Sequence, residues 1–251
     1  MFKSLPERKG GPHVYPVLHV DETFHTKEMI LRSGEAAQEA GAAGLFIFDE
    51  TKRGSRSTKY LDGVLGLLQT AQPDFAFGVS YPKHRGVLAA TYHVRGNLVV
   101  GEYEKEPMLW VDEPLAGTSH EVPVEDIVRV VKSPDLFTAE TPVVFGKFAP
   151  GQENDASSVV DVAVIGEPHK RPALTYDQLS AAIDESTLPV AVAGLQLRDE
   201  LFVLPENASA VILSSTVAID GIISAQRVRG FVQTAEKIAQ QKAEESTGSV
   251  A

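Results

Sequence analysis

The chain has 251 residues, of which 43% are hydrophobic and 23% charged, a composition that is typical of folded globular proteins and excludes disorder and membrane-spanning classes. Its formal net charge of −11 disfavours contact with a phosphate backbone, so we expect no nucleic-acid partner. The lack of cysteine excludes disulfides, thiolate catalysis and cysteine-ligated metals.

The N-terminal sequence MFKSLPERKGGPH has no apolar core after its basic residues, so we expect no secretory signal and a cytoplasmic protein. Apolar runs elsewhere are too short to span a bilayer, and we expect no membrane span.

Strand and helix patterns alternate in the first third of the chain. Short apolar runs at 14–20, 45–48 and 75–79 are typical of strands. The segment from Thr26 to Ala40 has an apolar face at helical spacing and ends before Gly41, and the segment 60–68 repeats that spacing. This β-α-β-α-β order predicts a parallel sheet.

The segment from Gly86 to Glu104 allows two interpretations, because Val87–Ala90 opens like a helix and Leu98–Val100 reads like a strand. The alternation then resumes. We predict further strands at 108–111, 143–148, 162–165, 189–193 and 210–213, and helices at 124–131, at 176–184 behind Thr175, and from Ala225 to about Ala239.

Eight short apolar strands with helices between most of them favour an α/β fold, a single (β/α)8 TIM barrel, over an open sheet. We expect residues 1–12 to be an N-terminal extension and residues 13–239 to be the barrel domain. Residues 240–251 carry almost no apolar side chain beyond alanine, so we expect a flexible C-terminal tail.

Several stretches resemble the BtpA family of TIM barrels, which is named for a role in photosystem I biogenesis. They are PVLHV, EAAQEAGAAGLFIFDE, DGVLGLLQTAQPDFAFGV, LWVDEP, PVVFGKFA, VVDVAVIG, LPVAVAGL and ASAVILSSTVAIDGIISAQRVRGFV, which together extend from Pro16 to about Ala235. The resemblance implies a barrel similar to the phosphate-binding, ribulose-phosphate-like enzymes.

The sequence departs from the family's pattern in the turns after strands six to eight, where glycines would let backbone amides approach a phosphate. Gly166 and Gly194 remain there, and Ser214 and Ser215 stand where a glycine is expected. We therefore predict phosphate contacts at Gly166, Gly194, Ser214 and Ser215, held mainly by the serine hydroxyls and by Lys170 or Arg171. The alternative for the loop 167–172 is a surface turn.

Ionisable residues gather at the predicted carboxyl ends of the strands, where TIM barrels build their active sites. Our catalytic candidates are His19, Asp49, Asp112 and Lys147, because a charge that ends or interrupts an apolar strand is costly unless it meets a partner or a ligand. Lys147 would hold an anion, form a Schiff base or neutralise Asp112, and His19 would act in catalysis or pack in the core. No ligand spacing supports a metal site, and the cofactor is unknown.

Two functional hypotheses follow. The first is an enzyme, or an enzyme-derived protein, that binds a small phosphorylated or sugar-like ligand at the carboxyl end of the barrel. Its reaction is unknown, with a phosphosugar or nucleotide lyase or transferase as the candidate class. The second is a non-catalytic assembly or accessory protein on the same scaffold. A homo-oligomer is compatible with either hypothesis.

Overall fold

The computed structural model describes residues 11–49, 56–81, 86–99, 107–115, 124–132, 143–147, 157–166, 175–205 and 207–248. Eight parallel strands close into a barrel in their order along the chain. They are β1 (His13–Val20), β2 (Leu45–Asp49), β3 (Phe77–Ser80), β4 (Met108–Val111), β5 (Val144–Lys147), β6 (Val162–Ile165), β7 (Val190–Ala193) and β8 (Ala208–Leu213). The pairing of β1 with β8 closes the ring.

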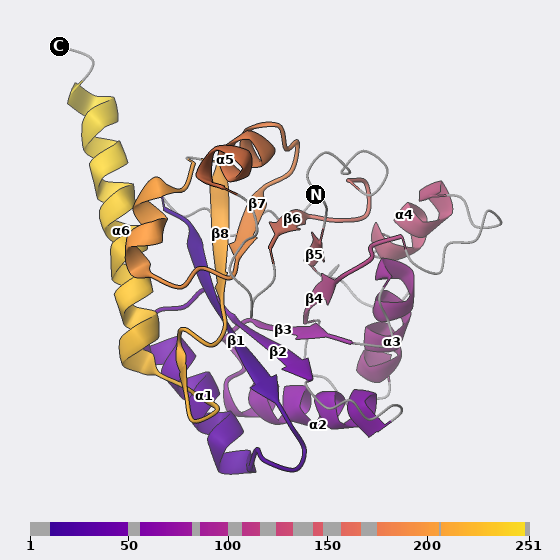
Figure 1. Cartoon of the computed structure of the whole chain (residues 1–251). Coiled ribbons are helices and arrows are strands. Elements are labelled where there is room, and N and C mark those ends of the chain that lie inside the picture. The colour runs from indigo at the N-terminus through magenta and orange to yellow at the C-terminus, as the bar shows by residue number, and fades with distance from the viewer. Residues whose placement is uncertain are drawn as a thin grey trace.

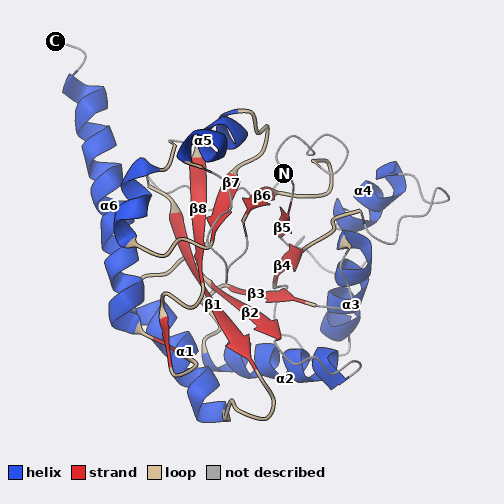
Figure 2. Ribbon diagram, viewed as in Figure 1, coloured by secondary structure: helices blue, strands red, loops and turns tan. Residues whose placement is uncertain are grey.

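Helices surround the strands, as the blue ribbons around the red arrows in Figure 2 show. They are α1 (Lys27–Glu39), α2 (Arg56–Ala71), α3 (Val87–Val99), α4 (Val124–Lys132), α5 (Tyr176–Asp184) and α6 (Ala225–Gly248). A 3-10 helix, η2 (Arg198–Val203), follows β7, and a hairpin of β9 (Ala218–Ile219) and β10 (Ile222–Ile223) follows β8. None of the described helices combines the length and apolar character needed to cross a bilayer.

Two helix starts are fixed by side chains that accept hydrogen bonds from the first turn. The Thr26 hydroxyl accepts from the Met29 amide at the start of α1. Thr175 and Gln178 form a reciprocal capping box at the start of α5. Gly41 follows α1 with a φ of 79°, a left-handed conformation that glycine adopts without strain.

Side chains alternate between the two faces of the barrel wall, except at a register shift between the starts of β7 and β8. One face packs under the helices and includes Leu45, Ile47 and Val79. The other face fills the lumen, and its buried cluster is Tyr15, Val17, Phe46, Met108, Trp110, Phe145, Val162, Val164, Ala191, Ala193, Ala210 and Ile212. The Phe46 and Phe145 rings meet edge to face with centroids 5.0 Å apart, so aromatic side chains close the lumen below its carboxyl end.

The predicted α/β fold, a single TIM barrel, is confirmed, and the predicted strand ranges at 108–111 and 162–165 coincide with β4 and β6. The strand interpretation of Leu98 and Val99 is wrong, because both residues belong to α3, while Val100 lies outside the described residues. The expected N-terminal extension, residues 1–12, lies mostly outside the described residues, which begin at residue 11.

The final helix is longer than predicted. We expected α6 to end near Ala239 and a flexible tail to follow, but α6 continues to Gly248. Its last turns contain Gln, Lys, Ala and Glu, which have high helix propensity, so the backbone stays helical without a core to pack on. Figure 1 shows this end of α6 projecting beyond the rest of the molecule.

Candidate site at the carboxyl end of the barrel

The carboxyl ends of the strands bring His19 and Ser214 into contact. His19 follows Tyr15 and Val17 on the lumen side of β1, and Ser214 follows Ala210 and Ile212 on the same side of β8. The distance between His19 Nε2 and Ser214 Oγ is 2.6 Å, a short hydrogen bond whose direction depends on the imidazole tautomer. Ser214 is only 2% exposed, so the bond orients both side chains at the end of the lumen.

Aromatic rings support the polar groups at this end. The His19 ring lies edge to face against Phe48, with ring centroids 5.7 Å apart. Phe48 in turn contacts Trp110, and the Trp110 indole donates a hydrogen bond from Nε1 to Asp112 Oδ1 at 3.0 Å. The indole therefore holds one carboxylate oxygen of Asp112 beside the lumen.

The structure does not bring the predicted catalytic residues together as one group. Lys147 follows Phe145 by two residues and shares its lumen side, at the carboxyl end of β5. Asp49 follows Leu45 and Ile47, so its side chain leaves β2 on the helix-facing side. The lumen side thus carries His19, Asp112 and Lys147, and Asp49 lies behind the barrel wall.

The two predicted glycines adopt conformations that other residues rarely tolerate. Gly166 has a φ of 95° and Gly194 a φ of 90°. A Cβ atom on Gly166 would lie 2.4 Å from the carbonyl oxygen of Ala193, which is far too close. Both glycines therefore shape the turns after β6 and β7, and Ser215 is exposed in the turn after β8.

A carboxylate already occupies backbone amides in the turn after β7. Glu200 Oε2 accepts hydrogen bonds from the amide of Gln196 at 2.7 Å and from the amide of Leu197 at 3.0 Å. The Thr216 hydroxyl donates to the carbonyl oxygen of Leu195 at 3.0 Å, which ties this turn to the one after β8. Sequence reasoning missed Glu200, although its position three residues after Leu197 is the spacing of a helix-capping glutamate.

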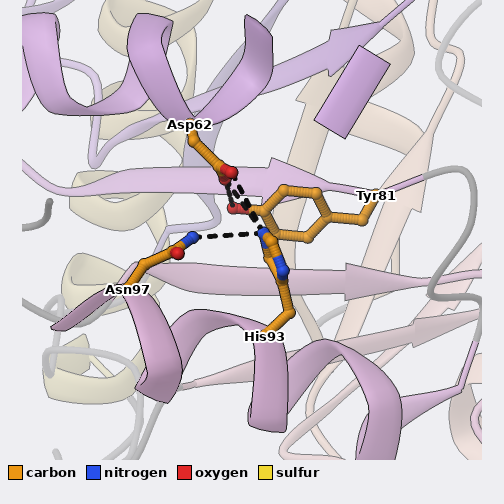
Figure 3. Close-up of polar contacts among 4 residues, drawn as sticks. All are labelled: Asp62, Tyr81, His93 and Asn97. Carbon is orange, nitrogen blue, oxygen red and sulfur yellow. Dashed lines mark hydrogen bonds and ion pairs between the residues drawn. The ribbon is translucent and has the colours of Figure 1, made fainter. Parts of the chain in front are cut away.

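A second polar cluster lies outside the lumen, between α2, α3 and the end of β3, and is drawn in Figure 3. The Tyr81 hydroxyl donates to Asp62 Oδ1 at 2.9 Å, and His93 Nε2 lies 3.0 Å from the same oxygen and 3.2 Å from Oδ2. The Asn97 amide nitrogen lies 3.1 Å from His93 Nε2. Asp62 and Tyr81 are buried, and the contacts of Tyr81 and His93 with the Asp62 carboxylate join the two helices to the end of β3.

No group of three or more His, Asp or Glu side chains among the described residues is arranged to hold a metal ion. The predicted contacts at Lys170 and Arg171 lie outside the described residues.

No protein-family model matches the chain, and no curated protein sequence matches it. Solved structures do match. The α-subunit of tryptophan synthase from Legionella pneumophila str. Paris has 11% identity and a TM-score of 0.60, covering 90% of this chain and 93% of that one. Thiamine phosphate pyrophosphorylase from Pyrococcus furiosus has 13% identity and a TM-score of 0.57, with coverages of 90% and 96%.

The third structure is (S)-3-O-geranylgeranylglyceryl phosphate synthase from Thermoplasma acidophilum in complex with its substrate sn-glycerol-1-phosphate. It has 12% identity and a TM-score of 0.54, covering 90% of this chain and 94% of that one. At such identities these matches establish the shared TIM-barrel fold.

Proposed function

We propose that this protein binds a small phosphorylated or sugar-like molecule at the carboxyl end of its barrel. The observation that carries the proposal is the hydrogen bond between His19 and Ser214 at the end of the lumen, on the side of the barrel wall that also carries Lys147. TIM barrels place their ligands at this end, often with a phosphate near the turns after strands seven and eight. Ser214 stands at the second of these turns.

Each lumen-side group has a chemical role in the proposal. Lys147 supplies a positive charge for an anionic group of the ligand. His19 exchanges a proton or a hydrogen bond with the ligand while Ser214 orients its ring. Asp112, held by the Trp110 indole, is the candidate base or hydroxyl ligand. Asp49 is left out of this set because its side chain lies on the other side of β2.

The phosphate would be held mainly by side chains. The carboxylate of Glu200 already accepts from the amides of Gln196 and Leu197, the donors that a phosphate would otherwise use after β7. Among the described residues, Ser214, Ser215 and Lys147 are the groups at this end that we expect to contact the phosphate. Side-chain contacts are less preorganised than backbone amides, so affinity should be modest and should fall with salt.

We further infer that the chain is a divergent relative of the BtpA-like barrels. The stretches LWVDEP and PVVFGKFA support this, since they contain Asp112 and Lys147 at the ends of β4 and β5. The glycine-poor turns after β7 and β8 are where the chain departs from that family.

The test is isothermal titration with a panel of phosphosugars, each paired with the same sugar without its phosphate. The wild type should bind a phosphorylated member, and Lys147→Met should weaken that binding by about tenfold or more, the loss expected for one partly buried charge contact. Lys237→Met, which changes an exposed lysine on α6, is the matched control. Tight, salt-insensitive binding that survives Lys147→Met and the pair Ser214→Ala and Ser215→Ala would reject the side-chain site.

One observation favours a second candidate, a non-catalytic accessory protein. The amides after β7 are occupied by the chain's own Glu200, as in a barrel that no longer uses this turn for a ligand. This candidate predicts that no phosphorylated compound in the panel binds, so the same titration separates the two.

A further inference from the structure

A cavity of about 610 Å³ lies outside the barrel, where the loop after β1 meets α1 and α2. Figure 1 shows α1 and α2 side by side beneath the strands, and the two helices are in contact. The lining residues are Glu22, His25, Lys27, Ile30, Lys59, Tyr60, Gly63, Val64 and Leu67. None of them belongs to the site at the end of the lumen, so a ligand in this cavity would bind independently of the proposed function. Pockets for small molecules have volumes of about 300–1,000 Å³, and this cavity falls within that range.

The cavity has an apolar base and a charged rim. Ile30 and Val64 are buried, and Leu67 and the Tyr60 ring extend this base along α2. The exposed rim carries the ammonium groups of Lys27 and Lys59 and the carboxylate of Glu22. A molecule that matches both parts has an apolar body and one polar end.

One wall of the cavity is fixed by hydrogen bonds. His25 Nδ1 accepts from the Asp21 amide at 3.1 Å, and this leaves Nε2 protonated to donate to the Gly221 carbonyl oxygen at 3.0 Å. The imidazole joins the loop after β1 to the turn between β9 and β10. Gly221 has a φ of 78°, and a Cβ atom there would lie 2.7 Å from the Phe24 ring. These contacts hold the His25 wall of the cavity in place.

The lining contains two features that a ligand would satisfy. Its lysine and carboxylate side chains carry two positive charges and one negative charge, although the whole chain carries a net charge of −11. The Tyr60 hydroxyl is buried and makes no hydrogen bond with any described residue. Burial, followed by the carboxylates of Asp21, Asp49 and Glu22, raises the pKa of Tyr60 to about 12, so the phenol remains a hydrogen-bond donor.

We propose that this cavity binds a small amphiphilic carboxylate, with its apolar chain or ring against Ile30, Val64 and Leu67 and its acidic end beside Lys27 and Lys59. A single negative charge fits the site better than a doubly charged phosphate, because Glu22 at the rim and the carboxylates of Asp21 and Asp49 near Tyr60 would repel the second charge. The Tyr60 hydroxyl donates to an oxygen of the bound molecule.

The probe for this site is octanoate, titrated into the full chain by calorimetry. Its matched analogues are 1-octanol, which has the same chain without the charge, octylamine, which reverses the charge, and acetate, which lacks the chain. We expect octanoate to bind more tightly than all three. Equal binding of 1-octanol would overturn the charged end of the proposal, and tighter binding of octylamine would overturn its sign.

Two glycines provide a matched pair of variants that locate the site. A Cβ atom on Gly63 or on Gly96 would meet nothing within 4 Å, and both residues lie inside helices. Gly63 lines the cavity and Gly96, on α3, does not. Gly63→Leu fills the cavity and should abolish octanoate binding, whereas Gly96→Leu should leave it unchanged. Both variants should fold, because leucine has a higher helix propensity than glycine.

Charge variants test the orientation independently of the cavity filling. Lys27→Gln together with Lys59→Gln should weaken octanoate binding by about fivefold, the effect of partly exposed charge pairs, and should leave 1-octanol unaffected. Glu22→Gln should strengthen octanoate binding. Octanoate binding that survives Gly63→Leu, or that ignores all three charge changes, would overturn the assignment of this cavity.

Discussion

The side chains of His19 and Ser214 are 195 positions apart in the sequence and meet at 2.6 Å between Nε2 and Oγ. They stand at the ends of β1 and β8, the first and last strands of the barrel, whose pairing runs as far as Pro16 opposite Leu213. The contact therefore joins the two strands that close the ring at the end where the proposed ligand binds. Ser214, which positions the His19 imidazole, therefore also supports the closure of the barrel.

Ser214→Ala should lower the free energy of unfolding by about 0.5–1.5 kcal/mol, because it removes one hydrogen bond from a buried site. Ser215→Ala is the control, since Ser215 is exposed and its loss should change stability by less than about 0.5 kcal/mol. Denaturant titration of both variants measures the difference. Equal stability of the two variants would show that the contact contributes nothing.

Gly166→Ala should destabilise the protein by at least about 2 kcal/mol, since its φ of 95° is strained for alanine and the new Cβ would lie 2.4 Å from the Ala193 carbonyl oxygen. Gly63→Ala is the matched control, because it lies inside α2 with nothing within 4 Å of its Cβ, and alanine favours a helix by up to about 1 kcal/mol. The two glycine substitutions should change the thermal midpoint in opposite directions. A tolerated Gly166→Ala would contradict the close approach of β6 and β7.

The barrel could be predicted because its strands are apolar on both faces and are separated by helical patterns, as in β4 and β6. The failure at Leu98 and Val99 has a local cause. These apolar residues follow Gly96 and Asn97, which are typical of a turn, yet the helical stretch from Val87 continues through them. Packing of α3 against its neighbours overrides the local signal.

The candidate site was less predictable. Because the strands are apolar on both faces, the sequence pattern does not indicate which side chains face the lumen and which face the helices. In β2 the lumen side holds Phe46 and Phe48, and a shift of one position would have placed Asp49 there instead. Lys147 and Asp49 both end apolar strands, and only their positions in the alternation along each strand place Lys147 on the lumen side and Asp49 on the helix-facing side. The Asp62 cluster joins residues from α2, from α3 and from the position after β3, and no spacing pattern along the sequence predicts it.

The raised pKa of Tyr60 predicts how stability depends on alkaline pH. Burial and then the carboxylates of Asp21, Asp49 and Glu22 raise the pKa of Tyr60 from 10.0 to about 12 in the folded protein. Between these two values the unfolded chain releases the phenol proton while the folded protein keeps it, so the free energy of unfolding falls as pH rises. Below pH 10 the phenol is protonated in both states, so the free energy of unfolding does not yet fall on account of Tyr60.

Tyr60→Phe should therefore show a shallower loss of stability across this window than the wild type. Denaturant titrations at a series of alkaline pH values measure the two slopes. Tyr176→Phe, which changes an exposed tyrosine on α5, controls for the removal of one phenol. Identical slopes for wild type and Tyr60→Phe would contradict the effect of burial on this hydroxyl.

The cluster in Figure 3 predicts that Tyr81→Phe lowers the free energy of unfolding by about 1.5–3 kcal/mol, the contribution of a buried hydrogen bond to a charged group. Tyr92→Phe on the exposed side of α3 is the matched control and should cost less than about 0.5 kcal/mol. Asp62→Ala should cost more than Tyr81→Phe, because it leaves both the Tyr81 hydroxyl and His93 without the carboxylate. If Tyr81→Phe and Tyr92→Phe unfold at the same denaturant concentration, α2 and α3 are held to the barrel by apolar packing and the cluster does not stabilise them.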